Sequence, residues 1–231
     1  MVPLAKSLQR RKSLYEQTYE ALRQSILEGM LAPGDRLIET QIAQQLQVSR
    51  TPIREALRQL QQEELVTADA NGWLRVATVS ASEAVHLYNC RMALETLSVS
   101  EACNQATPTQ LEQLALCVAE AEALAQRSPQ SDLGQQLLAL DYRFHHLIAE
   151  SSGNQCLVSL LEQVFSKMML LRLQTTRQNP NVLEVRKEHQ DIYQAIAQQD
   201  PETAIAAITS HLTASKERVV KELAQIHGNP L

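Results

Sequence analysis

Apolar residues recur every three to four positions through most of this chain, and short polar breaks divide the pattern into segments. Beyond residue 80 the breaks are Thr107-Pro108, Ser128-Pro129, Ser152-Gly153, Asn179-Pro180 and Asp200-Pro201. A period of 3.6 residues indicates amphipathic helices, and Pro, Gly and Asn are typical of their ends. The breaks predict helices over residues 82–105, 109–126, 132–151, 154–176, 182–199 and 201–227. Short connections make consecutive helices antiparallel, so residues 80–231 are expected to form a six-helix bundle.

Residues 13–79 follow a different order. Helical segments are expected over 14–28, 40–46 and 51–64, with Thr40 as the N-cap of the second and with Ile42, Ala43 and Leu46 turned inward. Two strand-like runs, 65–68 and 73–79, then flank Asn71-Gly72, which favours a hairpin because both turn positions adopt positive φ. Three helices and a hairpin predict a winged helix-turn-helix, so the chain is expected to be mainly α.

Composition agrees with a helical fold and places the charge unevenly. Aromatic residues make up 3% of the chain, and the strong helix formers Leu, Ala, Gln and Glu are abundant. The net charge is −5, which is unusual for a nucleic-acid binder, but residues 1–79 carry +1 and residues 80–231 carry −6. A local basic patch is enough for such binding, and the acidity belongs to the bundle.

The first dozen residues, MVPLAKSLQRRK, are basic and aperiodic, which predicts a flexible tail over residues 1–12. They lack the apolar centre of a secretory signal. No apolar run approaches the roughly 20 residues that a membrane helix needs. A cytoplasmic protein without membrane contact is therefore expected.

The start of the third helical segment is rich in hydrogen-bond donors. A recognition helix enters the major groove by its N-terminal end, where free N–H groups also favour phosphate. Arginine there can bind guanine through two hydrogen bonds. Arg54 and Arg58 share a face one turn apart, outside the apolar stripe. The alternative is a solvated face on which Glu55 pairs with Arg58. The donors are Ser49, Arg50, Thr51, Arg54 and Arg58.

A second group of residues falls on the apolar faces of the bundle. Asp141 and His145 are four residues apart and lie on one helix face, where an unpaired carboxylate would be costly. His189 lies within the apolar stripe of its own helix, and His211 lies at the flank of another. Taken singly, each histidine is more often a hydrogen-bonded core or rim residue than a ligand. Together, one carboxylate and three imidazoles suit a divalent transition metal such as zinc or nickel, with coordination positions left open.

Residues 29–66, GMLAPGDRLIETQIAQQLQVSRTPIREALRQLQQEELV, resemble the signature of the GntR family of transcription regulators, most densely over Val48 to Leu57. The family usually has Gly where Glu64 stands and often Gly-x-Gly where this chain has Asn71-Gly72-Trp73. The later helices are similar to the FCD ligand-binding domain of the FadR-like branch, and their number is closer to its shorter, VanR-like subgroup. The residues that carry this similarity are Arg91-x-x-x-Glu95, Asp141-x-x-Phe144-His145, Ser152-Gly153-Asn154, Glu188-His189 and His211.

The resemblance implies roles for individual residues. It assigns Arg50 and Arg54 to bases or adjacent phosphates, Ser49 and Thr51 to the DNA backbone, and Arg58 to the same interface. Arg36 belongs to the motif and would contact phosphate or brace the fold, and Gly72 would lie at the wing tip. In the helical domain the resemblance points to four metal ligands, Asp141, His145, His189 and His211.

A metal with open positions inside an apolar bundle would bind a carboxylate oxygen and select small organic acids as effectors. Arg91 borders the same helix face and could clamp a carboxylate, although an Arg91–Glu95 pair that only supports the helix is an alternative. The sequence thus predicts a metabolite-responsive repressor or activator that binds a near-palindromic operator as a homodimer. The alternative function is a metal-dependent enzyme with an accessory DNA-binding domain.

Overall fold

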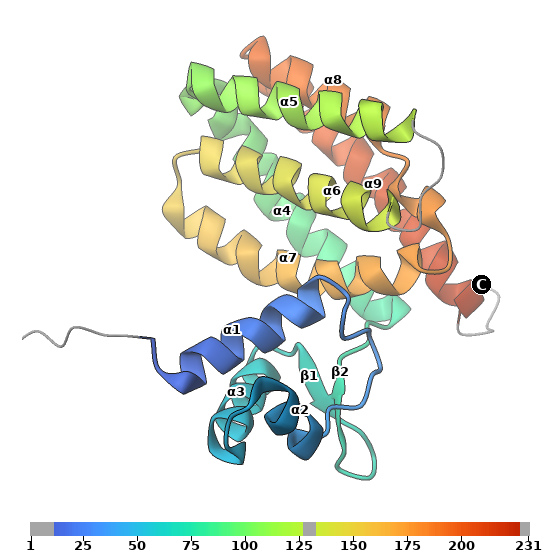
Figure 1. Ribbon diagram of the computed structural model, residues 1–231. Coiled ribbons are helices and arrows are strands. Elements are labelled where there is room, and N and C mark those ends of the chain that lie inside the picture. Colours follow the sequence, from blue (N-terminus) through green and yellow to red (C-terminus); the bar gives the residue numbers. More distant parts are fainter. Residues whose placement is uncertain (1–11, 127–132, 227–231) are drawn as a thin grey trace, which may run out of the picture. The chain divides into compact units, whose positions relative to one another are not determined.

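The computed structural model describes residues 12–126 and 133–226, which form two compact units. One unit ends at Ala77 and the other begins at Thr78. The first holds three helices and a hairpin, and the described part of the second consists of helices joined by short links (Figure 1). The expected winged helix-turn-helix and six-helix bundle are both confirmed.

The N-terminal unit contains the helix-turn-helix and a small sheet. Its strands pair antiparallel, with Val66 opposite Val76 and Ala68 opposite Leu74. The segment 34–37 lies along the outer edge of the second strand, because Gly34 N–H donates to the Val76 carbonyl and Leu37 N–H donates to the Leu74 carbonyl. The elements are α1 (Leu14–Leu27), α2 (Glu39–Leu46), α3 (Arg50–Gln62), β1 (Val66–Ala68) and β2 (Leu74–Val76).

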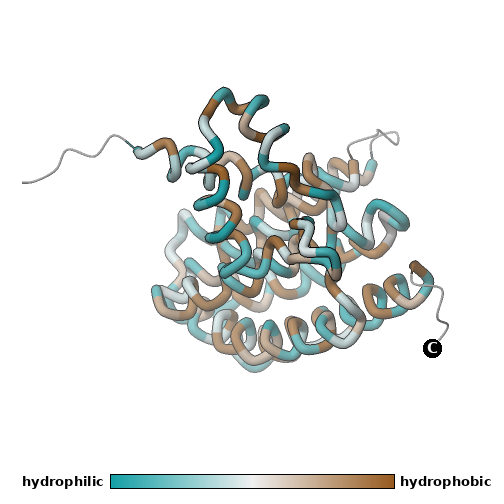
Figure 2. Tube along the Cα trace, turned by 90° about the horizontal axis from the view of Figure 1, so that it is seen from below, coloured by the Kyte–Doolittle hydropathy of each residue, from teal (hydrophilic) through white to brown (hydrophobic). Residues whose placement is uncertain are grey.

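Local sequence explains where α1 and α3 form. Ser13 and Glu16 make a capping box at the start of α1, which satisfies two N–H groups that the helix leaves open. The two helices pack through their apolar stripes, and the buried core includes Ile26 and Leu60. Figure 2 shows hydrophobic and hydrophilic residues alternating along the helices, as this packing requires.

Three local expectations for this unit were wrong. Helix α2 begins at Glu39 after Ile38, without a side-chain cap, so Thr40 is not its N-cap. Leu46 is 38% exposed because it is the last residue of α2, before Gln47 turns left-handed. The strands are shorter than predicted and five residues join them. In that loop Gly72 has positive φ but Asn71 does not, since Asp69 closes the loop by accepting the backbone N–H of both Asn71 and Trp73.

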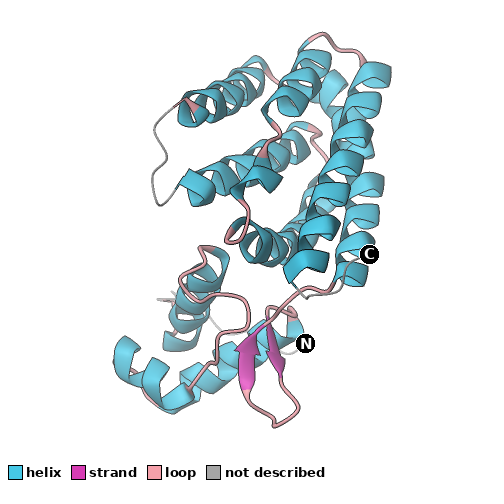
Figure 3. Ribbon diagram, turned by 90° about the vertical axis from the view of Figure 1, so that its right-hand side faces the viewer, coloured by secondary structure: helices cyan, strands magenta, loops and turns pink. Residues whose placement is uncertain are grey.

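The C-terminal unit is a bundle of six α-helices within the described residues, joined by short connections (Figure 3). The long helices α4 and α9 pack along each other, and α8 packs on α9. Helices α5, α6 and α7 follow in order, with α6 between α5 and α7. The bounds are α4 (Ala81–Gln105), α5 (Pro108–Ala125), α6 (Leu133–Ser151), α7 (Gln155–Thr176), α8 (Arg186–Ala197) and α9 (Pro201–Ile226).

The predicted helix over 182–199 starts four residues late. A short 3-10 turn, Pro180–Leu183, precedes it, and Val185 is not helical. Val182, Leu183 and Val185 are all buried. Apolar residues that anchor a link in the core produce the same pattern as a helix face, which explains the error. The predicted tail before Lys12, the break at Ser128-Pro129 and the end at residue 227 lie outside the described residues.

No helix among the residues that the structure describes has both the length and the apolarity needed to cross a membrane.

Candidate functional site

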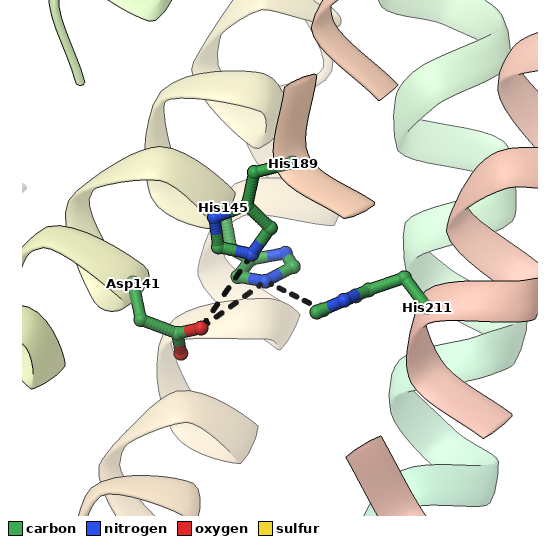
Figure 4. A group of neighbouring side chains, drawn as sticks. All are labelled: Asp141, His145, His189 and His211. Carbon is green, nitrogen blue, oxygen red and sulfur yellow. Dashed lines mark hydrogen bonds and ion pairs between the residues drawn. The ribbon is translucent and has the colours of Figure 1, made fainter. Parts of the chain in front are cut away.

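Four buried side chains from three helices converge inside the bundle (Figure 4). Asp141 and His145 come from successive turns of α6, His189 from α8 and His211 from α9. One ligand atom of each lies within 4.8 Å of those of the others. His211 is fully buried, although its place at the flank of an apolar stripe gave a weaker indication. The structure therefore brings together all four residues predicted as metal ligands.

The His145 and His211 rings face each other through nitrogen atoms that cannot hydrogen-bond to each other when both rings are neutral. His145 Nδ1 lies 2.5 Å from the Glu95 carboxylate and His211 Nδ1 lies 2.7 Å from the Glu188 carboxylate. An ionised carboxylate only accepts hydrogen bonds, so both Nδ1 atoms carry a hydrogen, and in a neutral ring the Nε2 atom then carries a lone pair. These Nε2 atoms are 3.2 Å apart. Such a contact is favourable only with a proton or a metal cation between the rings.

The remaining two ligand atoms are buried without a hydrogen-bond partner. They are Asp141 Oδ1 and His189 Nε2, which lie 3.6 Å apart. The His189 ring stacks on Phe144, with centroids 4.3 Å apart, so its plane is held in place. Because unpartnered buried polar atoms are costly, this pair indicates a missing partner. Oxygen and imidazole donors in this number fit a divalent transition metal.

The pKa values of three of the ligands, Asp141, His189 and His211, favour the protonation states that metal binding requires. Burial lowers the pKa of His211 to about 4 and that of His189 well below its usual range, so both rings are neutral near pH 7. Burial would raise the pKa of Asp141, but the nearby Arg172 guanidinium outweighs that effect and lowers it. In the same way Arg91 and His145 lower the pKa of buried Glu95 to about 2.

Two buried arginines border the ligand set. Arg91 pairs with Glu95 at 2.5 Å, the alternative that sequence reasoning left open. Arg172, on α7, donates to Ser215 Oγ and to the Val182 carbonyl, but its buried Nε has no partner. A cavity of about 20 Å³, room for about one water, lies among Arg91, Arg172, Asp141, His145 and apolar side chains of α6 and α7.

Sequence reasoning missed the supporting residues Arg172 and Glu188. Arg172 interrupts the apolar run Met168–Leu173, and a lone charge in such a run is a signal that could have singled it out. The sequence offered Glu188 only as the neighbour of His189 in a motif of the family resemblance. In the structure it accepts from His211 and from both terminal nitrogens of Arg218.

The predicted DNA-contacting residues of α3 are exposed together at and after its N-terminus. Their arginines are not all free. Glu39 of α2 accepts from Arg50 at 3.0 Å and from Arg54 at 2.8 Å through one carboxylate oxygen. No ion pair joins Glu55 to Arg58 within the described residues. The exposed set comprises Ser49, Arg50, Thr51, Arg54 and Arg58.

Arg36 and Gly72 lie apart from α3, at the hairpin. The Arg36 guanidinium lies 3.6 Å from the centre of the Trp73 ring, and its backbone forms a bridge with Arg75. Gly72 is exposed in the loop, with open space where a Cβ would stand.

Comparison with known proteins shows the family to which the chain belongs. Residues 14–74 match the model described as bacterial regulatory proteins, gntR family, and residues 86–214 match the FCD domain. The HTH-type transcriptional regulator LutR of Bacillus subtilis is 30% identical over 81% of this chain and 93% of its own length. The chain belongs to the GntR family.

Further similarities agree with this membership. The B. subtilis regulator YdhC is 28% identical over 89% of the chain and 90% of that protein. McbR/YncC of E. coli has the same fold, with a TM-score of 0.76 and 23% identity over 94% of this chain and all of that one. This GntR-family member is thus a DNA-binding transcription regulator with an FCD domain. Since the matched families and relatives are transcription regulators, the metalloenzyme alternative is set aside.

Proposed function

We propose that this GntR-family regulator binds a near-palindromic operator as a homodimer and that a small organic acid modulates its DNA affinity. The acid would bind at a divalent metal centre, zinc or nickel, held by Asp141, His145, His189 and His211. The geometry of two histidines supports the metal centre most directly. The Nε2 atoms of His145 and His211 are 3.2 Å apart, and both Nδ1 atoms are hydrogen-bonded to carboxylates. A cation between them removes the conflict.

The bound ion would supply a coordination position for a carboxylate oxygen of the effector. The chain supplies the remaining recognition. Arg91 and Arg172 border the same cavity as Asp141 and His145, and the unpartnered Nε of Arg172 is a free donor there. Since the cavity holds only about 20 Å³, an acid would enter by moving lining side chains. Met168 and Met169 are suited to this because their unbranched side chains adapt easily.

The DNA-binding half rests on α3. Arg50 and Arg54 would contact bases or phosphates after leaving Glu39, which holds them in this structure. Ser49 and Thr51 would contact the DNA backbone, and Arg58 would lie at the same interface. Gly72 and Arg36 would add contacts from the hairpin. Two such helices in a dimer would meet half-sites about one helical turn, roughly 34–36 Å, apart.

The metal centre is tested by elemental analysis and native mass spectrometry of the purified protein. We expect about one divalent ion per chain, together with a small acid lost after chelation. His211→Ala should abolish metal retention. His146→Ala is the matched control, since His146 lies on the same helix as His145 but faces Glu162. Protein that retains no metal, or His211→Ala that retains it fully, would contradict the centre.

The DNA-binding half is tested separately with Arg54→Ala. We expect sequence-selective binding in a genomic selection experiment to be lost while the oligomeric state stays the same. Arg23→Ala is the control, because Arg23 lies on α1 beside Glu63. Unchanged selectivity of Arg54→Ala would contradict the assignment.

A further inference from the structure

The only tryptophan of the chain is exposed at the hairpin. Trp73 immediately precedes β2 and is 51% exposed, whereas large apolar side chains are usually placed in the core. The Arg36 guanidinium lies 3.6 Å from the centre of its ring, well within the range of a cation–π contact. An exposed aromatic ring covered by one arginine calls for an explanation that core packing does not supply.

The backbone places both side chains on the outer face of the sheet. Arg36 lies opposite Arg75 across the edge of β2, and Trp73 precedes Arg75 by two residues. Because side chains alternate between faces along a strand, these three share one face. The positions that follow Arg36 and Arg75 point to the core, since Leu37 is 6% and Val76 is 1% exposed. The outer face of the hairpin therefore carries two arginines and an indole.

Asp69 holds the backbone of Trp73 through two hydrogen bonds. The Asp69 backbone N–H donates to the Trp73 carbonyl at 2.9 Å, and the Asp69 carboxylate accepts the Trp73 N–H at 3.0 Å. The other carboxylate oxygen accepts from Arg75 Nε at 2.8 Å. Asp69 thus restrains the backbone at Trp73 and at the same time pairs with Arg75.

Arg36 differs from most cations of the N-terminal unit in having no carboxylate partner. Among its described residues, Lys12, Arg23, Arg50, Arg54 and Arg75 each pair with an acid, and only Arg36 and Arg58 do not. Stacking on a ring occupies the face of the guanidinium and leaves its five N–H donors free at the edge. Such a group is oriented for a planar or tetrahedral anion at the surface.

We infer that Trp73 is a positioning residue that holds Arg36 for a phosphate of duplex DNA, in a contact separate from those of α3. The inference rests on the DNA-binding role of the chain and adds to it. The partner follows from charge, because an uncompensated, preorganised cation on the DNA-binding unit matches the phosphate backbone.

The test uses the full-length protein and a mixed-sequence duplex of roughly 30 base pairs, enough for about three helical turns. Phosphate contacts do not depend on sequence, so no operator is needed. Affinity is measured by fluorescence polarisation across a salt series. Log affinity falls as log salt rises, and each lost phosphate contact should make this slope less steep by about 0.9. We expect that loss for each bound chain with Arg36→Gln or Trp73→Leu, but not with Trp73→Phe, which keeps an aromatic face, or with the control Arg23→Gln.

The double variant Arg36→Gln/Trp73→Leu separates positioning from an independent effect of the indole. If Trp73 acts through Arg36, the double variant binds no more weakly than Arg36→Gln alone. Additive losses, or wild-type affinity and slope in Trp73→Leu, would overturn the inference.

A spectroscopic readout needs no variant. Because the chain has one tryptophan, its fluorescence reports on Trp73 alone. Saturating duplex should lower the acrylamide quenching constant, since the ring would be covered. An unchanged constant in a complex that polarisation shows to be saturated would overturn the inference while leaving DNA binding by α3 intact. Absence of any duplex binding at low salt would overturn both.

Discussion

Glu64 adopts a backbone conformation that glycine accepts more easily. Its φ is +58°, and it follows α3 as the left-handed residue of a Schellman motif, with Leu65 N–H donating to the Leu60 carbonyl and Glu64 N–H donating to that of Gln61. GntR-family sequences usually have Gly at this position. Glu64 therefore keeps the turn that glycine makes in the family, but its backbone is strained.

We expect Glu64→Gly to raise the free energy of unfolding by about 0.5–1 kcal/mol, because it relieves the left-handed conformation. Urea unfolding followed by circular dichroism measures the change. Gln62→Gly is the matched control, since Gln62 is the last residue of α3, and it should lower the free energy by a similar amount. Equal destabilisation by both substitutions would contradict the strain argument.

Tyr19 joins α1 to the end of α3 through a hydrogen bond of 2.7 Å to Glu63. Burial and the Glu63 carboxylate raise the pKa of Tyr19 to about 12 from its usual 10.0. The folded form therefore holds the phenol proton more tightly than the unfolded chain. The stability that depends on this proton is complete below pH 10 and is lost as pH rises towards 12.

Tyr19→Phe should accordingly destabilise the protein by about 1 kcal/mol near pH 7, where the hydrogen bond is intact. The gap in unfolding free energy between wild type and variant should narrow as pH rises from 10 towards 12. Denaturant titrations at a series of pH values measure it. A gap that widens over this range would be inconsistent with the raised pKa.

At the scale of elements, the ligand cluster depends on carboxylates that accept hydrogen bonds from the Nδ1 atoms of two ligand histidines. Glu95 of α4 orients His145, and Glu188 of α8 orients His211 across the packed α8 and α9. Arg218 of α9 binds Glu188 through both terminal nitrogens, which restrains the carboxylate. The helix pair is thus tied to the geometry of the site.

Glu188→Gln should weaken zinc binding by about 10- to 100-fold, as expected when a carboxylate behind a ligating histidine is lost. Competition with a chelating dye measures the affinity. Glu184→Gln is the control, because Glu184 pairs with Arg186 at the surface and does not reach the cluster. Equal zinc affinity of the two variants would show that Glu188 does not support the site.

At the scale of the molecule, the two units should respond differently to metal. All four candidate ligands lie in the unit that begins at Thr78, so metal bound there stabilises that unit alone. With free metal at about 100 times Kd, the stabilisation would be about 2.7 kcal/mol. Differential scanning calorimetry should show the bundle melting at lower temperature after chelation, with the transition of the N-terminal unit unmoved. Identical thermograms with and without chelator would contradict metal binding by the bundle.

What the sequence determined by itself was local. The 3.6-residue period established the helical class, and the spacing of Asp141 and His145 placed both on one face of α6, because neighbours at i and i+4 share a face in any helix. The donors after Val48 lay outside the apolar stripe of α3 for the same reason. Local patterns predicted the wrong structure in two places. Val185 lies in a buried link that resembles a helix face, and the Asp69 side chain sets the conformation of the hairpin loop.

Only the tertiary structure decided which distant residues meet. His189 and His211 reach the α6 pair because α8 and α9 pack against the rest of the bundle, and Glu39 reaches Arg50 and Arg54 because α2 crosses α3. The isolated charge of Arg172 became meaningful only beside Asp141. Periodicity shows which side of a helix faces inward, but the packing of helices far apart in the chain sets which inward-facing side chains touch.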